Sequence, residues 1–201
     1  SQYALVVADE AIKNSKIEIS SINSDRAGVI WGSGIGGMET FFNESISFSK
    51  GSAPRFNPFF IPKLISDIPA GHISIKYNFR GPNFTTVSAC ASSTNAIIDA
   101  VNYIKWNKAD IFIAGGSEAC IFEPGIGGFN AMMALSTRNE DPKTASRPFD
   151  KNRDGFVMGE GGGALVLEEY KSAKKRGATI YAEIVGGGLT ADAFHITAPH
   201  P

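Results

Sequence analysis

Two short runs of the sequence carry apolar side chains at nearly every position, at residues 27–31 (AGVIW) and 110–114 (DIFIA). A strand that is apolar on both faces is typical of a sheet covered on both sides by helices. Segments with helical spacing of apolar residues separate the predicted strands, and this alternation is typical of parallel crossover units. The sequence therefore predicts an α/β domain built in three layers.

The same patterns predict the other elements. Further strands are expected at residues 84–89, 163–169 and 179–188. Helices are expected at residues 4–12, 38–48, 63–77, 92–107 and 170–177. Residues 51–62 are proline-rich and should form a loop, and residues 115–162 should be mostly loop with a helical turn at AMMAL.

Three details of the predicted helices can be checked. Pro69 should mark the start of the helix at 63–77 or kink it. Gly177 suits the C-terminal cap of the last helix. The helix at 92–107 should bury one apolar stripe, made of Ala96, Ile97, Ala100, Val101 and Ile104.

Composition narrows the class of protein. Apolar residues make up 43% and charged residues 19% of the 201 positions, as in an ordinary soluble globular domain. A net charge of −1 gives no support for a nucleic-acid partner, and no apolar run is long enough to cross a membrane. Two cysteines are no disulfide framework, so a cytoplasmic location is expected. The chain lacks an initiator methionine and stops without a closing element, which indicates a piece of a longer protein.

Cys90 stands in the segment TTVSACASSTNA, where a predicted strand passes into a predicted helix. At a helix N-terminus, unpaired N–H groups and the helix dipole favour a thiolate, and the Cys90 N–H is placed to stabilise an oxyanion. Ser92, Ser93 or Asn95 could cap the helix. From position alone, a catalytic nucleophile and a buried structural cysteine both remain open. Cys120 has no such setting and is expected in the core.

The glycine-rich segment GSGIGG, at residues 32–37, matches the G-x-G-x-x-G turn of dinucleotide-binding proteins between a strand and a helix. Such a site needs an acidic residue at the end of the next strand, about twenty positions on. The chain there reads SAPRFNPFF, which is not a strand. A tight turn that lines a pocket is therefore the favoured interpretation.

A second motif, DKNRDGFVMGEGGG from Asp150, is similar to a calcium loop. The position of the bidentate glutamate falls on Gly161, with Glu160 one place early, and no helices flank the loop. We expect no metal or cofactor here. A structured turn is favoured instead, held by pairs among Arg147, Arg153 and Asp154.

Several segments in order are more specific than any single motif. They are GSGIGG, PRFNPFFIP, AGHISIKYNFRGPN, SACASSTNA, IFIAGGSEA, GFNAMMALSTRN, ASRPFDKNRDGFVMGEGGGALVLEE, AKKRGATIYAEIVG and DAFHITAPHP. Together they closely resemble the β-ketoacyl-acyl-carrier-protein synthases, the type II elongating condensing enzymes. The resemblance implies a thiolase-like fold with five layers in the complete enzyme, of which residues 1–201 would form most of the N-terminal αβα half, without its first strand.

The resemblance also implies a reaction and its residues. An acyl group would pass from acyl carrier protein to Cys90, and malonyl carrier protein would then lose carbon dioxide and attack the acyl-enzyme. A homodimer is implied. Four substrate-binding positions are implied as well: Ile35 as a gate of the acyl pocket, Phe60 reaching across the dimer, Phe129 near the nucleophile and Thr197 on the pantetheine arm.

Parts of the family pattern are missing. Its two catalytic histidines and a glycine-rich loop belong to the C-terminal half, and neither motif is present; His195 and His200 are not those residues, and His72 is expected to be structural. We therefore expect the chain alone to be unable to complete the condensation. A polyketide ketosynthase, a thiolase and a non-catalytic partner subunit remain alternatives, although the presence of Cys90 argues against the last.

Overall fold

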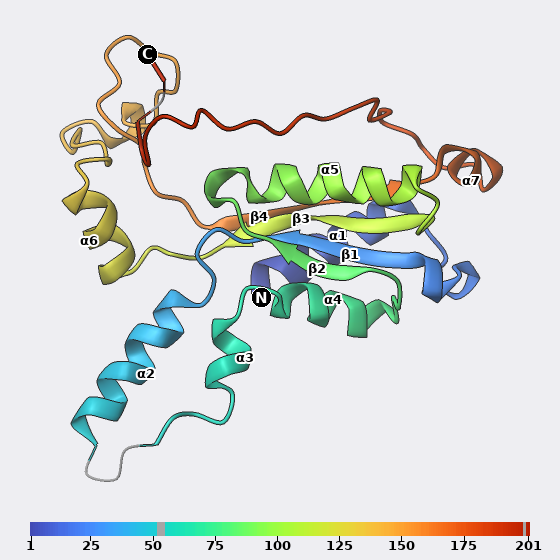
Figure 1. The fold of residues 1–201 in the computed structure, drawn as a ribbon, viewed down its shortest axis with the longest axis horizontal. Helices are drawn as coiled ribbons and strands as arrows, with labels where there is room; N and C mark the ends of the chain where they lie inside the picture. The colour runs from blue at the N-terminus through green and yellow to red at the C-terminus, as the bar shows by residue number, and fades with distance from the viewer. Residues whose placement is uncertain (52–54, 199) are drawn as a thin grey trace.

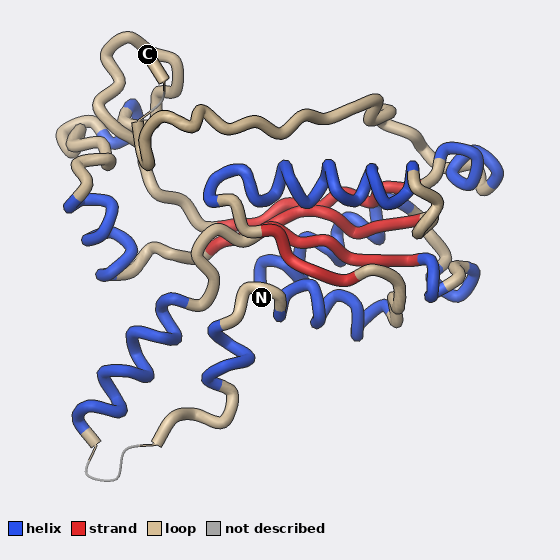
Figure 2. Tube along the Cα trace, in the orientation of Figure 1, coloured by secondary structure: helices blue, strands red, loops and turns tan. Residues whose placement is uncertain are grey.

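A mixed four-stranded sheet forms the centre of the protein, as Figure 2 shows. The computed structural model describes residues 1–51, 55–198 and 200–201. The strands are β1 (Ala27–Gly32), β2 (Asn83–Thr86), β3 (Ile111–Glu118) and β4 (Gly161–Glu168), in the spatial order β2-β1-β3-β4. β1 is parallel to β2 and β3, whereas β4 is antiparallel to β3. The parallel units were predicted, and the reversal of β4 was not.

Helices cover both faces of this sheet (Figure 1). Helices α1 (Gln2–Ser15) and α4 (Ile68–Tyr77) pack on one face, and α5 (Ser92–Lys105) packs on the other. The three-layer α/β arrangement is therefore confirmed. The carboxyl ends of β1, β2 and β3 lie at the same end of the sheet, and α5 begins at that end.

The two apolar runs of the sequence form the central strands, and their side chains alternate between two cores. Val29 and Trp31 of β1 face α1 and α4, whereas Ile30 faces α5. In β3, Ile113 faces α1 and α4, whereas Phe112 faces α5. All five side chains are completely buried, which explains why these strands are apolar throughout.

The predicted stripe of α5 is confirmed in its main contacts. Ala96 and Ala100 are completely buried against β1 and β3, and Ile97 and Ile104 pack beside them. Val101 is half-buried. Small residues at the two buried positions let this helix lie close to the sheet.

Several boundaries differ from the predictions. The helix expected at 63–77 is two helices, α3 (Phe60–Leu64) and α4, and Pro69 lies at the start of α4. Residues 52–54 of the predicted proline-rich loop lie outside the described part of the chain, and α3 begins inside the rest of it. The stretch expected to be loop also holds the end of β3 and a further helix, α6 (Glu123–Ala131). Helix α7 (Tyr170–Lys175) ends two residues before Gly177, which terminates it as predicted: its φ is 72° and its N–H donates to the Lys174 carbonyl.

The strand expected at 179–188 is not formed. Residues after α7 instead run as an extended segment along the outer side of α5 (Figure 1), where Lys105 Nζ donates a hydrogen bond to the Val185 carbonyl at 3.1 Å. The pattern of β-branched residues is there, but a strand needs a neighbouring strand to accept its backbone hydrogen bonds. No such neighbour lies beside it among the described residues.

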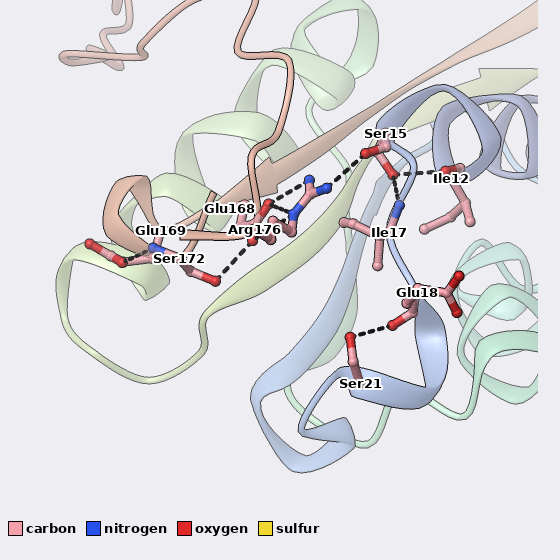
Figure 3. A network of polar contacts seen from close by, with 9 residues as sticks. All are labelled: Ile12, Ser15, Ile17, Glu18, Ser21, Glu168, Glu169, Ser172 and Arg176. Carbon is pink, nitrogen blue, oxygen red and sulfur yellow. Dashed lines mark hydrogen bonds and ion pairs between the residues drawn. The ribbon is translucent and has the colours of Figure 1, made fainter. Parts of the chain in front are cut away.

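An arginine closes the end of the sheet opposite to the start of α5 (Figure 3). Arg176 pairs with Glu168 at the end of β4, at 2.8 Å, and donates to the Ser15 carbonyl at the end of α1, at 2.9 Å. A cavity of about 400 Å³ lies at this end, lined in part by Ile17 and Asp110. It is remote from the carboxyl ends of the parallel strands, so it does not belong to the site described below.

The central core can be tested by removing one buried side chain. Ile113→Ala should lower the free energy of unfolding by about 2–5 kcal/mol, because a fully buried isoleucine leaves a cavity. Ile75→Ala, at a side chain that is 81% exposed on α4, should change it by less than about 0.5 kcal/mol. Urea denaturation of both variants measures this difference, and equal losses would contradict the assignment of the core.

Candidate active site

Cys90 lies in a short turn between strand β2 and helix α5. β2 ends at Thr86, a 3-10 turn covers Ala89–Ala91, and α5 begins at Ser92. Cys90 is exposed to solvent. The predicted junction of strand and helix is confirmed, with one helical turn of tighter geometry inserted before α5.

Ser92 holds this turn from inside the helix. Its side chain is buried, accepts a hydrogen bond from the Ser88 N–H at 2.9 Å and donates to the Ala89 carbonyl at 2.7 Å. Asn95 donates to the Ser88 hydroxyl at 2.6 Å. The prediction that Ser92, Ser93 or Asn95 caps α5 in the usual way is wrong, because the capping position is Ala91 and has no side-chain bond. Ser92 and Asn95 instead hold the turn that precedes the helix.

The backbone directly before the cysteine is unusual. Ala89 has a φ of 49°, a left-handed conformation that costs an alanine about 1–3 kcal/mol and is enriched at functional sites. In the turn that follows, the N–H groups of Ala91 and Ser92 bond to Ser88 and Ala89. The Cys90 N–H has no acceptor in the described part of the chain. It is therefore free to donate to a substrate oxygen.

Two glycines allow α5 to begin this close to the sheet. A β carbon at Gly32, the last residue of β1, would lie 2.5 Å from the backbone nitrogen of Ser93. A β carbon at Gly116 of β3 would lie 2.0 Å from the Ser93 hydroxyl and 2.7 Å from the Gly32 carbonyl oxygen. Any larger residue would push the helix and the Cys90 turn away from the strand ends.

The GSGIGG loop follows β1 and wraps around a carboxylate of the protein itself. The N–H groups of Gly34, Ile35 and Gly36 donate to the Glu118 side chain at 2.6, 2.9 and 3.3 Å. Converging backbone N–H groups form an anion-binding nest, and here Glu118 occupies it. A dinucleotide phosphate would have to displace that carboxylate, so the interpretation as a tight turn is favoured over a nucleotide site.

The other predicted site residues lie on elements that leave the same end of the sheet. Ile35 is in the loop just described. Phe60 begins α3 and is stacked on Phe56, with ring centroids 4.8 Å apart. Phe129 lies on α6 and meets Phe156 edge-on, with ring centroids 5.1 Å apart.

Thr197 lies in the exposed segment after α7, where its N–H donates to His195 Nδ1 at 3.1 Å. Of the four predicted substrate-binding positions, Ile35 lies in a loop that contacts the Cys90 turn among the described residues, through its neighbours Ser33 and Gly34.

Cys120 differs from Cys90 as predicted. It is 8% exposed and belongs to the buried residues. Burial, and next the nearby carboxylates of Glu118 and Glu160, raise the pKa of the Cys120 thiol. A thiol that ionises less readily is a poorer nucleophile.

The calcium-like loop uses its acidic groups internally. Asp150 accepts from the Asn152 N–H at 2.7 Å and pairs with Arg147 at 3.1 Å, and both contacts lower the pKa of its carboxyl group. Arg153 donates to the Asp150 carbonyl, so arginine side chains hold this turn as predicted. Asp154 was expected to pair with an arginine, but it accepts hydrogen bonds from residues 136 and 137.

Comparison with known proteins identifies the family. The profile described as "Beta-ketoacyl synthase, N-terminal domain" matches residues 1–173. The chain belongs to the β-ketoacyl synthase family. The exposed cysteine at the start of α5 therefore lies in a ketosynthase domain. It is at the end of the sheet where the parallel strands β1, β2 and β3 have their carboxyl ends.

Curated relatives are similar over the entire chain. A "3-oxoacyl-[acyl-carrier-protein] synthase 2" of Staphylococcus aureus is 52% identical over 200 residues, which are 100% of this chain and 49% of the relative. A "Putative 3-oxoacyl-[acyl-carrier-protein] synthase, mitochondrial" of Schizosaccharomyces pombe is 50% identical over 202 residues, 47% of its length. The chain spans about half the length of the curated relatives it matches.

Solved structures share the fold. A crystal structure of a β-ketoacyl synthase from Burkholderia phymatum superposes with a TM-score of 0.89 at 37% identity, over 97% of this chain and 48% of that one. A ketosynthase of a type II polyketide synthase, described in complex with its acyl-carrier protein, superposes with a TM-score of 0.91 at 32% identity, over 96% of this chain and 49% of that one. The thiolase-like half predicted from the motifs is confirmed.

Sequence reasoning missed one residue of the site, Glu118. The motif IFIAGGSEA contains it, but nothing in that string assigns it a role. The available signal was positional: an acidic residue at the carboxyl end of a strand whose parallel neighbour ends in a glycine-rich loop. Because β3 was predicted to end at Ala114, Glu118 was placed in a loop instead.

The close approach of α5 can be tested at Gly32. Gly32→Ala should lower the free energy of unfolding by about 1–3 kcal/mol, because the added methyl group overlaps backbone atoms of Ser92 and Ser93. Amide hydrogen exchange should rise at the start of α5. Gly71→Ala, on the open side of α4, should raise stability by about 0.5–1 kcal/mol. Chemical denaturation and exchange mass spectrometry measure both effects, and an unaffected Gly32→Ala protein would contradict the packing.

Proposed function

We propose that this protein is a β-ketoacyl-acyl-carrier-protein synthase of fatty acid biosynthesis, with Cys90 as its nucleophile. The single observation that carries the proposal is the exposed Cys90 on a strained turn at the start of α5, with its own N–H unoccupied. The 52% identity to a 3-oxoacyl-[acyl-carrier-protein] synthase supports the same assignment.

The first half of the reaction uses groups of this chain. The Cys90 sulfur attacks the carbonyl carbon of an acyl thioester on acyl carrier protein, and the developing oxyanion accepts a hydrogen bond from the Cys90 N–H. The carbon–sulfur bond to the carrier breaks, and the carrier thiolate leaves and takes up a proton. The product is a thioester on Cys90.

The second half needs more than these residues. Malonyl carrier protein loses carbon dioxide, and the carbanion formed attacks the Cys90 thioester, so that a carbon–carbon bond forms and the Cys90 sulfur leaves. In the family that the motifs resemble, two histidines of the C-terminal half assist this step. Residues 1–201 alone should therefore be unable to complete the condensation, and the groups they supply serve the acyl-transfer step.

The acyl chain would be bound by apolar side chains near Cys90. We assign Ile35 as a gate and Phe129 as a wall of this pocket, with Thr197 beside the pantetheine arm. Each methylene group buried there contributes about 0.8 kcal/mol, which favours long chains. Phe60 would come from the neighbouring subunit.

A homodimer is supported by an arm that projects from the sheet, formed by α2 (Met38–Lys50) and α3 (Figure 1). The Phe56 ring, between the two helices, stacks on Phe48 of α2 and on Phe60 of α3, with ring centroids 4.6 and 4.8 Å apart. Phe59 is 64% exposed on the same arm. The short strand β2 also leaves an open edge of the sheet. A second copy of the chain would cover both features.

The proposal places the protein in the cytoplasm. Both cysteines are free thiols, as a reducing compartment favours. Among the described residues, no helix combines the length and the apolar character needed to cross a membrane.

Polyketide synthesis is the second candidate, favoured by the TM-score of 0.91 to a polyketide ketosynthase. The lower identity, 32% against 52%, argues for fatty acid synthesis. Saturated acyl carriers and poly-β-ketoacyl carriers as alternative donors would separate the two.

The nucleophile can be tested by mass spectrometry. Saturated acyl carrier protein should add one acyl group to the protein, and tryptic peptides should place it on Cys90. Cys90→Ala should abolish the adduct, whereas Cys120→Ala should retain it because that thiol is buried. With malonyl carrier protein added, a protein made at the full length of its relatives should release the β-ketoacyl product. An adduct that persists in Cys90→Ala would refute the assignment.

The arm can be tested by placing a charge on it. Phe59→Asp should shift the protein from dimer to monomer in sedimentation velocity, because a carboxylate would be buried against the second copy. Ile75→Asp, on the outer side of α4 and 81% exposed, should remain dimeric. A dimeric Phe59→Asp protein, or a monomeric wild type at micromolar concentration, would contradict the arm as the interface.

A further inference from the structure

Glu118 is the only carboxylate of the described chain that accepts three consecutive backbone N–H groups. It ends strand β3, and the donors are Gly34, Ile35 and Gly36 of the loop that follows β1. The Ser33 hydroxyl approaches the same carboxylate at 3.4 Å. Hydrogen bonds to a charged acceptor are about twice as strong as neutral ones, so this contact fixes the loop firmly.

No side-chain cation shares this carboxylate among the described residues, because the recorded ion pairs all involve other acidic groups. The Ser1 ammonium interacts electrostatically with Glu118, and the loop backbone supplies the three N–H donors of its hydrogen bonds. Gly36 has a φ of 78°, which a nest of converging N–H groups requires and which larger residues rarely adopt. The loop is therefore shaped around the anion.

The other side of the same loop touches the Cys90 turn. A β carbon at Gly34 would lie 3.1 Å from the Glu118 carboxylate and 3.3 Å from the Ala89 carbonyl oxygen. The Ser33 carbonyl oxygen also lies 3.4 Å from the Ser92 hydroxyl, whose proton is directed mainly to Ala89. The loop thus lies between Glu118 on one side and Ala89 and Ser92, which flank the nucleophile, on the other.

We propose that Glu118 is a positioning residue, which sets where the Ile35 side chain and the Cys90 turn lie by holding the loop between them. The proposal rests on the function proposed above, because Ile35 is assigned there to the acyl pocket. Its expected signature is a change in acyl-chain preference together with a slower acyl transfer. A residue that served stability alone would change neither.

Two variants separate charge from shape. Glu118→Gln keeps the size of the side chain but replaces one carboxylate oxygen by an NH₂ group, which cannot accept a hydrogen bond. The remaining amide oxygen is a weaker acceptor for the three N–H donors. Glu118→Ala removes the carboxylate and leaves an empty anion site of backbone donors. Sodium formate could then enter this site and restore the loop, as a free carboxylate of minimal size.

The experiment measures acylation of Cys90 in a protein made at the full length of its relatives, with short and long acyl carrier thioesters. Both variants should acylate between about tenfold and a hundredfold more slowly at saturating donor, because a displacement near 1 Å has an effect of that order. The ratio of long-chain to short-chain rates should change. Formate should recover part of the rate of Glu118→Ala, and sodium chloride at equal ionic strength should not.

A matched control is available at the other end of the sheet. Glu168 also ends a strand and holds a network of hydrogen bonds, to Arg176 and Ser172 (Figure 3). Glu168→Ala should lose stability, but its acylation rate at a temperature well below unfolding, its chain preference and its response to formate should match the wild type. Equal behaviour of the two alanine variants would overturn the positioning role.

A second readout keeps this proposal separate from the proposed function. Hydrogen exchange at the amides of Gly34, Ile35 and Gly36 should accelerate in Glu118→Ala and slow again with formate, whether or not acyl carriers react. If wild-type Cys90 is not acylated, the proposed function fails while exchange still decides whether Glu118 holds the loop. If acylation proceeds normally in the wild type and in both Glu118 variants, the positioning role fails and the proposed function stands.

Discussion

Helix α5 begins so close to the ends of β1 and β3 that no β carbon fits at Gly32 or Gly116. This steric constraint determines the rest of the candidate site. It places the turn of Cys90 directly above the parallel ends of the strands, and it makes Ala89 adopt a left-handed backbone conformation between strand and helix. The small buried residues Ala96 and Ala100 continue the same close contact along the helix.

The polar contacts in this region hold the Cys90 turn and the loop beside it in place. Ser92 fastens the turn from the first position of α5, and Asn95 supports it one turn later. The loop after β1 is held by hydrogen bonds from its backbone to the Glu118 carboxylate. In this way an exposed cysteine is held by a rigid surround, which is the arrangement that precise attack on a thioester carbonyl requires.

Much of the fold followed from the sequence, because the two runs 27–31 and 110–114 are apolar on both faces and only a covered sheet buries them. The position of Cys90 was also predictable, since a strand and a helix flank it. The strand β4 was predicted, but its antiparallel direction was not, because a strand's direction leaves no mark on its own pattern. The failure at 179–188 has a related cause: strand propensity is realised only where a partner strand exists.

The site was predicted unevenly for a physical reason as well. Cys90 can be predicted from the strand and the helix that adjoin it in sequence. Glu118, in contrast, is 82 residues from Gly36, and the parallel pairing of β1 and β3 brings the two together. Contacts of that range depend on register, which short motifs do not encode. The roles of Phe129 and Thr197 rest on resemblance, and they remain proposals.

The central claim is that the Cys90 turn presents both a nucleophile and an oxyanion donor. A crystal structure of the protein, at the full length of its relatives and acylated on Cys90 by a fatty acyl thioester, tests it most directly. The account predicts a thioester whose carbonyl oxygen lies within hydrogen-bond distance of the Cys90 N–H, with the acyl chain directed past Ile35. A carbonyl oxygen pointing away from that N–H into solvent, with α5 unmoved, would contradict it.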